Sequence, residues 1–223
     1  MVLKVTDVVY REPVPETYGN IYFVVRDDGV IVIDTGIPGK EGVILDDVRS
    51  LGFSPSQVKA IILTHYHMDH SGSAEALRSA TGAKIYVHRD DAPYLQGLVK
   101  PEFPKEAPRE AVEAYRWFRP LRPDVTLSDG DEVLGLKVIH APGHTPGSIA
   151  LYDRRHLFAG DNLNLREGRV QGPPPQFTTD MGRARESVRR LLSLDFDVLL
   201  PGHGEPVVGG ASARARQDLK GFL

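Results

Sequence analysis

The sequence has no cysteine among its 223 residues. Disulfide bonds, thiolate nucleophiles, iron–sulfur clusters and cysteine-based zinc sites are therefore excluded. It also lacks an uninterrupted apolar stretch near the ~18 residues of a membrane-spanning helix, and its N-terminal segment has no apolar signal-peptide core. We therefore expect a soluble, cytoplasmic protein with no membrane partner.

The sequence also has no large excess of basic or acidic residues. The 27 basic and 30 acidic side chains leave a formal net charge of −3, which gives no electrostatic footprint for nucleic acid. Hydrophobic residues make up 41% and charged residues 26%, shares that argue against disorder and fibrous repeats. The length fits a single domain, which we place at residues 1–223.

Apolar β-branched runs alternate with amphipathic stretches, a pattern typical of a mixed α/β fold. Strands are predicted at Asn20–Val25, Val30–Asp34, Lys59–Thr64, Lys84–His88, Glu132–His140, Ser148–Tyr152, His156–Ala159 and Asp197–Leu200. Helices are predicted at Gly39–Leu51, Ser73–Thr81, Ala107–Phe118, Asp180–Leu194 and Ala211–Phe222. The turn residues between the first two strands predict a hairpin, so the sheets are not purely parallel.

Residues 92–123 interrupt this alternation. The segment contains six prolines and five aromatic residues, which are Tyr94, Phe103, Tyr115, Trp117 and Phe118. We expect an inserted excursion with one helix. Aromatic side chains suit an apolar binding surface and prolines keep a loop semi-rigid, so we hypothesise that the segment forms one wall of a substrate pocket. The alternative is that Trp117 and Phe118 only pack the helix onto the domain.

The strongest chemical signal is the run His65-Tyr66-His67-Met68-Asp69-His70, directly after an apolar strand. Residues two apart face away from each other on a helix, so these side chains converge only on a turn. Neutral imidazole and carboxylate are ligands that suit zinc, iron or manganese. The alternative is a chance cluster of exposed histidines.

Three further loops carry a histidine or aspartate at the end of a predicted strand: His144 in Gly-His-Thr, Asp161 in Ala-Gly-Asp and His203 in Pro-Gly-His-Gly. Each could be an ordinary turn residue. Loops at the ends of strands are also where a rigid sheet places functional residues, and several such loops in one chain favour a site.

This ordered set of motifs, preceded by the Asp-Thr-Gly of residues 34–36, resembles the metallo-β-lactamase fold superfamily in its glyoxalase II-like hydrolase branch. The resemblance implies an α/β fold, a four-layer αβ/βα sandwich of two mixed sheets flanked by helices. It also implies a site for two divalent metal ions at one edge, with zinc favoured over iron or manganese.

Position by position, the resemblance implies that His65, His67 and His144 hold one metal ion and that Asp69, His70 and His203 hold the other. Asp161 would bridge both ions, and Asp34 would support the site without binding metal. A water shared by two divalent ions is deprotonated near neutral pH and becomes the nucleophile. Asp69 is the catalytic candidate, because it is placed to pass a proton to the leaving group.

The expected function is hydrolysis of a small ester, thioester or lactone by a metal-bridging hydroxide, with a small-molecule substrate as partner and a homodimer left open. The alternative is an iron-dependent oxidoreductase similar to persulfide dioxygenases. Glyoxalase II has a C-terminal domain that binds glutathione, which we do not expect here because about 20 residues follow His203. The segment Asn162-Leu163-Asn164 lacks the tyrosine of acylhomoserine lactonases.

The three remaining histidines are excluded from the predicted ligands. We interpret His88 and His140 as structural residues and His156 as a turn residue.

Overall fold

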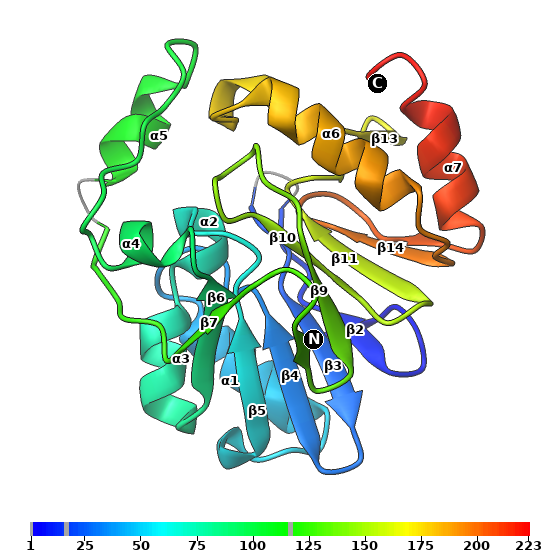
Figure 1. The fold of residues 1–223 in the computed structure, drawn as a ribbon. Coiled ribbons are helices and arrows are strands. Elements are labelled where there is room, and N and C mark those ends of the chain that lie inside the picture. The colour runs from blue at the N-terminus through cyan, green and yellow to red at the C-terminus, as the bar shows by residue number, and fades with distance from the viewer. Residues whose placement is uncertain (1, 16–17, 116–117) are drawn as a thin grey trace.

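Two β-sheets lie face to face at the centre of the molecule (Figure 1). The computed structural model describes residues 2–15, 18–115 and 118–223. The first sheet is antiparallel from β1 to β4 and parallel from β4 to β7. Its strands, in spatial order, are β1 (Leu3–Lys4), β2 (Val9–Arg11), β3 (Tyr22–Arg26), β4 (Gly29–Ile33), β5 (Val58–Ile62), β6 (Lys84–His88) and β7 (Val125–Leu127).

The second sheet is also mixed, because β11 and β14 pair in parallel while its other pairs are antiparallel. Its strands, in spatial order, are β15 (Val207–Val208), β14 (Val198–Pro201), β11 (His156–Gly160), β10 (Ile149–Tyr152), β9 (Leu136–His140) and β8 (Glu132–Val133). A separate ribbon joins β12 (Asn164–Arg166) to β13 (Arg169–Gln171).

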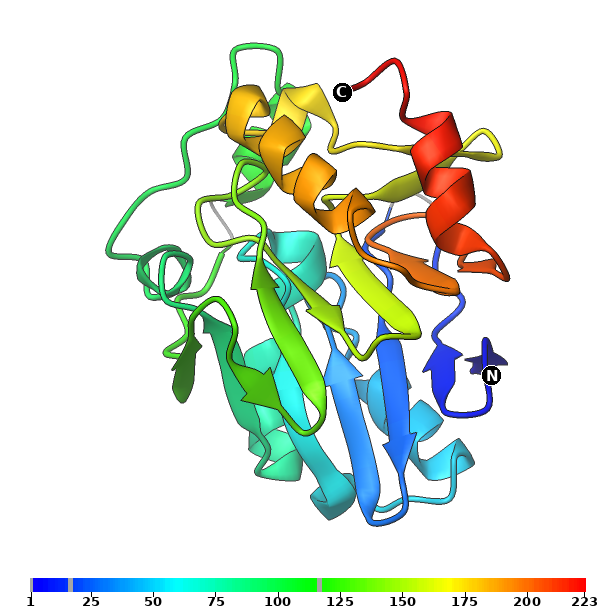
Figure 2. The same ribbon diagram turned by 45° about the vertical axis from the view of Figure 1, so that its right-hand side comes forward.

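Helices cover the outer faces of both sheets (Figure 2). In the described part of the chain they are α1 (Glu41–Ser50), α2 (Met68–Ser71), α3 (Ala74–Thr81), α4 (Ala92–Leu95), α5 (Arg109–Ala114), α6 (Met181–Leu192) and α7 (Ala211–Asp218), with 3-10 turns at Pro55–Gln57 and Pro175–Phe177. Helices α1 and α3 pack on the first sheet, and α6 and α7 on the second. Among the described residues, no helix is long and apolar enough to cross a membrane.

Side chains alternate between the two faces of each strand, and this alternation separates the core between the sheets from the cores beneath the helices. In β4, Ile31 and Ile33 pack between the sheets with Phe158, whereas Val30 and Val32 pack against α1. Each fully buried aliphatic side chain stabilises the fold by about 1.5–3 kcal/mol. The predicted four-layer sandwich of two mixed sheets with flanking helices is confirmed.

Most predicted strands appear with ends shifted by no more than two residues. The exception is Glu132–His140, where the prediction of one strand is wrong. It is a hairpin of β8 and β9, and its turn places Leu134 at φ 50° and Gly135 at φ 82°. Two successive left-handed residues suit the twist of a tight hairpin, and Gly135 takes this conformation without strain.

The predicted helices appear, but with shorter bounds. The largest difference lies in the excursion, where the helix predicted at 107–118 is α5 (Arg109–Ala114) and the short α4 follows β6. Trp117 lies outside the described residues.

Candidate metal centre

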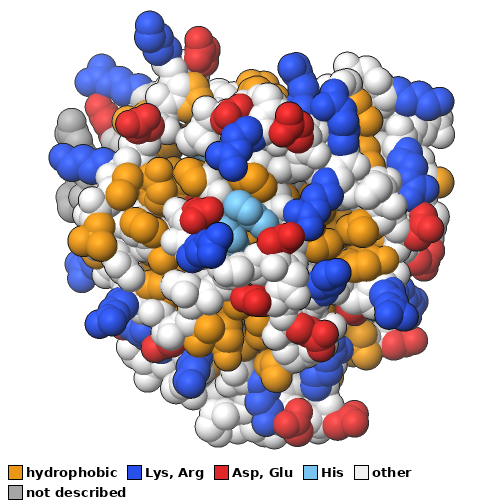
Figure 3. Space-filling view, viewed as in Figure 1, with side chains coloured by type: hydrophobic (Ala, Val, Ile, Leu, Met, Phe, Trp, Pro, Cys, Tyr) orange, Lys and Arg blue, Asp and Glu red, His pale blue; other side chains and the backbone are white. Residues whose placement is uncertain are grey.

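All the predicted site residues follow a strand. The run that begins at His65 comes after β5, His144 after β9, Asp161 after β11 and His203 after β14. Neighbouring parallel strands, β4 with β5 and β11 with β14, bring their carboxyl ends to one edge of each sheet. Because the two sheets pack face to face, these edges meet. Figure 3 shows histidine near the centre of the molecule in this view, beside acidic and basic side chains and with hydrophobic side chains on either side.

A first cluster joins His65, His67 and His144, whose ligand atoms lie within 4.8 Å of one another. His144 Nε2 is 3.0 Å from His67 Nδ1. His65 lies edge-on to both rings, with centroids 4.8 Å from each. All three side chains are buried, so three imidazole nitrogens converge on one small space.

A second cluster joins Asp69, His70 and His203, also within 4.8 Å. Asp69 Oδ2 is 3.3 Å from His203 Nε2 and 3.6 Å from His70 Nε2. Asp69 and His70 belong to the one-turn helix α2, so the motif continues from a turn into a helix that the sequence did not predict. The Asp69 side chain is 34% exposed, which makes it the most accessible ligand candidate of this cluster.

Asp161 lies between the two clusters. Its Oδ1 is 3.3 Å from both His70 Nε2 and His203 Nε2, and its Oδ2 is 3.4 Å from His144 Nε2. The backbone at Gly202 fits tightly against it, because a Cβ atom there would lie 2.1 Å from Asp161 Oδ1. One carboxylate thus faces both histidine groups, which is the geometry that a bridging ligand requires.

Two buried atoms without a hydrogen-bond partner support a fit between this donor set and metal ions. Seven buried side-chain atoms of the described residues have no such partner, and two of them, His65 Nε2 and Asp161 Oδ1, belong to this site. Buried polar atoms rarely stay unpaired, since each costs about 1–3 kcal/mol. His65, His70 and Asp161 have ligand atoms within 4.8 Å of one another, and imidazole and carboxylate are donors that suit zinc and iron.

The two clusters differ in the protonation that burial and charge favour. Burial and neighbouring histidines lower the pKa of His67 to about 3, and burial lowers that of His144 to about 4. Burial opposes charge in the second cluster too. For His203, the nearby Asp161 carboxylate outweighs the effect of burial and raises the pKa to about 10. For Asp69, the neighbouring histidines outweigh the effect of burial and lower the pKa to about 2. The first cluster therefore favours neutral imidazoles, the ligand form.

Asp34 orients one histidine of each cluster. Its Oδ2 accepts hydrogen bonds from His70 Nδ1 at 2.8 Å and from the Thr64 hydroxyl at 2.7 Å, and its Oδ1 accepts from the Thr64 backbone N–H at 2.7 Å. The Thr64 oxygen lies 3.0 Å from His65 Nδ1, so it accepts from that nitrogen. These bonds leave the Nε2 atoms of His65 and His70 facing the site. Such partners fix the tautomer and orientation of metal-binding histidines.

Two residues with related roles were missed by the sequence prediction. The Thr178 hydroxyl lies 3.2 Å from His144 Nδ1 and donates to Pro174 O, which leaves His144 Nε2 facing the first cluster. Asp91 is fully buried and accepts hydrogen bonds from the loops of both His67 and His144. Burial raises the pKa of Asp91 to about 7, against the effect of these bonds.

The other three histidines lie apart from these clusters. The rings of His88 and His140 stack with centroids 3.9 Å apart and planes at 14°, next to Asp90. Nearly parallel rings do not direct their in-plane lone pairs at one ion. His156 begins β11, which confirms the strand predicted from this residue and shows that its interpretation as a turn residue is wrong. Its ring is buried between Thr6 and the Asp153 carboxylate.

The excursion reaches the first cluster through aromatic rings. Phe103 and Tyr115 both have centroids 6.4 Å from that of His67, and they contact each other at 4.9 Å. The Met68 backbone N–H donates to the Tyr115 hydroxyl at 3.3 Å. Tyr94 instead stacks on the buried Tyr66 at 4.5 Å.

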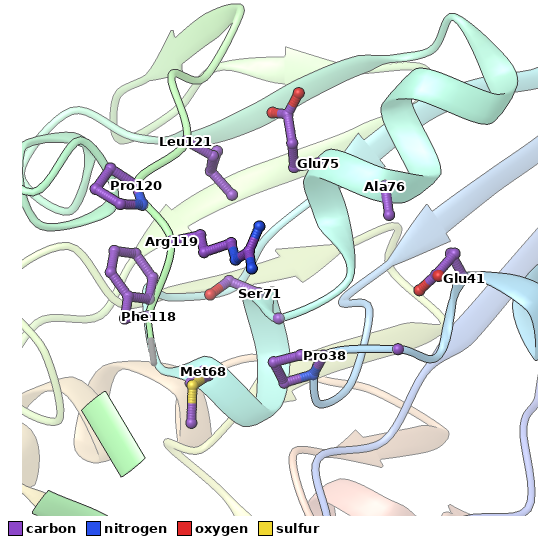
Figure 4. Close-up of a pocket in the computed structure, with 12 residues that line it drawn as sticks. Pro38, Glu41, Met68, Ser71, Glu75, Ala76, Phe118, Arg119, Pro120 and Leu121 are labelled. Carbon is purple, nitrogen blue, oxygen red and sulfur yellow. The ribbon is translucent and has the colours of Figure 1, made fainter. Parts of the chain in front are cut away.

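A cavity of about 340 Å³ lies on the other side of α2 (Figure 4). Met68 and Ser71 line it, together with Glu41 and residues 118–121. Asp69 and His70 occupy the opposite side of this helical turn. The cavity is therefore separated from the candidate metal centre by α2.

Comparison with known proteins identifies the family. Residues 14–203 match the family model of the metallo-β-lactamase superfamily, and the chain belongs to that superfamily. It is 32% identical to the probable metallo-hydrolase YflN of Bacillus subtilis, over 85% of this chain and 82% of that protein. It is 33% identical to the hydroxyacylglutathione hydrolase of Aeromonas salmonicida, over 84% of this chain and 61% of that protein.

Among solved structures, the fold is similar to that of TTHA1623 in a di-iron-bound form, with a TM-score of 0.71, 28% identity and coverage of 96% of this chain and 99% of that one. Family membership and the buried histidine–aspartate clusters together identify the chain as a metal-dependent hydrolase of this superfamily.

Proposed function

We propose that the chain binds two divalent metal ions and hydrolyses a small ester, thioester or lactone. The observation that carries this proposal is the position of Asp161, whose two oxygens face His144 on one side and His70 and His203 on the other. His65, His67 and His144 would hold one ion, and Asp69, His70 and His203 the other, with Asp161 shared. When bound, two such ions supply an activated water at neutral pH and polarise the substrate oxygen.

The residues of the chain contribute orientation and proton transfer. Asp34 and Thr178 fix the histidine tautomers, so the ligand atoms are ready before an ion arrives. Asp69 is the most exposed residue of the second cluster, so it is the candidate to pass a proton from water to the leaving group. A leaving alcohol or thiol needs that proton to depart as a neutral molecule.

The substrate class is supported by the surroundings of His67. Phe103 and Tyr115 present apolar rings next to the first cluster, which suits the acyl part of an ester or thioester. A small-molecule substrate, the absence of nucleic-acid and membrane partners, a cytoplasmic location and a homodimer stay predictions of the sequence.

A hydrolysis screen with metal analysis tests this proposal. Purified protein loaded with zinc, manganese or iron is assayed on matched esters, thioesters and lactones. We expect turnover of at least one of these classes that disappears after chelation and returns with the metal. Turnover that survives complete removal of metal would contradict the proposal.

Iron-dependent oxidation is the second candidate, because the imidazole and carboxylate groups of the two clusters also suit iron. The same screen separates the two. One iron per chain, with oxygen consumption on a persulfide and no hydrolysis, would favour the oxidoreductase.

A further inference from the structure

Asp91 is a buried carboxylate that joins two loops of the candidate metal centre. It follows β6, and its side chain has no exposed surface. Its Oδ2 accepts the Tyr66 backbone N–H at 2.9 Å and the Thr145 hydroxyl at 2.8 Å, and its Oδ1 accepts the Gly147 backbone N–H at 2.6 Å. Tyr66 stands between His65 and His67, and Thr145 follows His144, so one carboxylate holds both ligand-bearing loops.

The packing around this carboxylate leaves little freedom. A Cβ atom on Gly147 would lie 2.5 Å from the Asp91 backbone nitrogen and 2.7 Å from its Oδ1, so the loop approaches this closely only with glycine there. No basic side chain of the described residues pairs with Asp91. The hydrogen bonds that its carboxyl group accepts from side chains and loops come from the two ligand-bearing loops.

The three histidines of the first cluster depend on this arrangement, because they come from separate parts of the chain. His65 and His67 follow β5 in the first sheet, and His144 follows β9 in the second. His67 Nδ1 and His144 Nε2 face each other at 3.0 Å. Asp91 is the side chain that bonds to the neighbours of both.

We propose that Asp91 is a positioning residue that sets the distance between the His65–His67 loop and the His144 loop, and thereby the geometry and affinity of the first metal position. This inference rests on the proposed metal-dependent function. In the described part of the chain, Asp91 bonds to none of the ligand nitrogens. It acts through the backbone of Tyr66 and Gly147 and the hydroxyl of Thr145.

Asp91→Asn is the main test, because the amide keeps the size of the side chain but turns one acceptor into a donor that faces another donor. Thr145→Val removes a single bond to the same carboxylate. The matched control is Asp90→Asn, since Asp90 is the adjacent, exposed aspartate and, among the described residues, accepts no hydrogen bond from either loop. Metal-free protein is titrated with cobalt(II) and zinc against a chelator, and cobalt absorption spectra and melting temperatures are recorded.

We expect Asp91→Asn to fold, to bind the first metal equivalent about 10- to 100-fold more weakly and to show a changed cobalt spectrum. Thr145→Val should show a smaller effect in the same direction, and Asp90→Asn none. In the metal-saturated enzyme, kcat should fall more than KM rises.

Wild-type affinity and spectrum in both Asp91→Asn and Thr145→Val, with only lower melting temperatures, would show that Asp91 is purely structural. If Asp91→Asn does not fold, Thr145→Val decides alone. A wild-type protein that binds no metal would overturn the proposed function instead.

Discussion

Replacing Asp34 by asparagine is expected to weaken the metal centre without unfolding the protein. The Asp34 carboxylate accepts three hydrogen bonds, two of them from the Thr64 backbone and hydroxyl and one from His70 Nδ1. Asparagine offers one oxygen and one N–H₂ group, so in either orientation one donor faces another donor. The backbone at residue 34 has φ 59°, a conformation that asparagine tolerates as well as aspartate does.

The magnitude follows from the lost bond. A hydrogen bond to a charged group contributes about 1.5–3 kcal/mol, and about 1.4 kcal/mol corresponds to a factor of ten. We therefore expect metal affinity or turnover to fall about 10- to 100-fold, the range measured for partners of metal-binding histidines. Chelator-competition titrations with zinc give the affinities, and circular dichroism checks the fold.

Asp153→Asn is a matched control, because Asp153 also bonds to a histidine, His156, at a distance from the site. It should lower the melting temperature and leave metal affinity unchanged. If Asp34→Asn bound zinc with wild-type affinity, Asp34 would only stabilise the turn after β4, and its assigned role would be wrong.

Three further predictions concern residues outside the ligand set. Burial and the neighbouring Asp47 raise the pKa of Glu12 to about 7 from 4.5, so the stability that its neutral form provides is present below pH 4.5 and is lost as pH rises through 7. Glu12→Gln should therefore stabilise the protein by at most about 3 kcal/mol at pH 8 and little at pH 4. Equal effects of this substitution on urea unfolding at both pH values would contradict the prediction. His156→Ala should lower the melting temperature but keep metal content and activity, because its ring bonds to Thr6 and Asp153 far from the site; loss of metal would mean that the ligand histidines were wrongly chosen. Phe103→Ala should raise KM or shift acyl-chain preference at constant metal content. Tyr94→Ala, which removes the stack on Tyr66, should affect stability alone. Unchanged selectivity in Phe103→Ala would mean that residues 92–123 serve only for packing.

The sequence was informative where residue type and position carry the chemistry. Apolar strands that end in histidine or aspartate predicted a mixed α/β fold with a site at the strand ends, and the resemblance of these motifs to the metallo-β-lactamase superfamily implied the sandwich and the ligand set. His156 shows the limit of that reasoning, since the sequence predicted the strand that begins there but did not predict that the ring is buried between Thr6 and Asp153.

The residues that were missed act through contacts between distant parts of the chain. Asp90 and Asp91 are adjacent, yet the Asp91 side chain is buried and the Asp90 side chain is 46% exposed. Only the packing of the two sheets decides which carboxylate faces the loops. Thr178 lies 34 residues from His144, and no local pattern predicts that its hydroxyl meets the ring.

The metal-to-protein ratio of the wild type and of Asp161→Ala tests the central claim most directly, because Asp161 is the residue that would join the two ions. Both proteins are loaded with zinc, dialysed against metal-free buffer and analysed by mass spectrometry of the metal. We predict two ions per chain in the wild type, and a substantially lower ratio with no hydrolytic activity in Asp161→Ala, since the loss of the shared carboxylate leaves two cations facing each other. Two ions per chain and full activity in Asp161→Ala would contradict the dinuclear site.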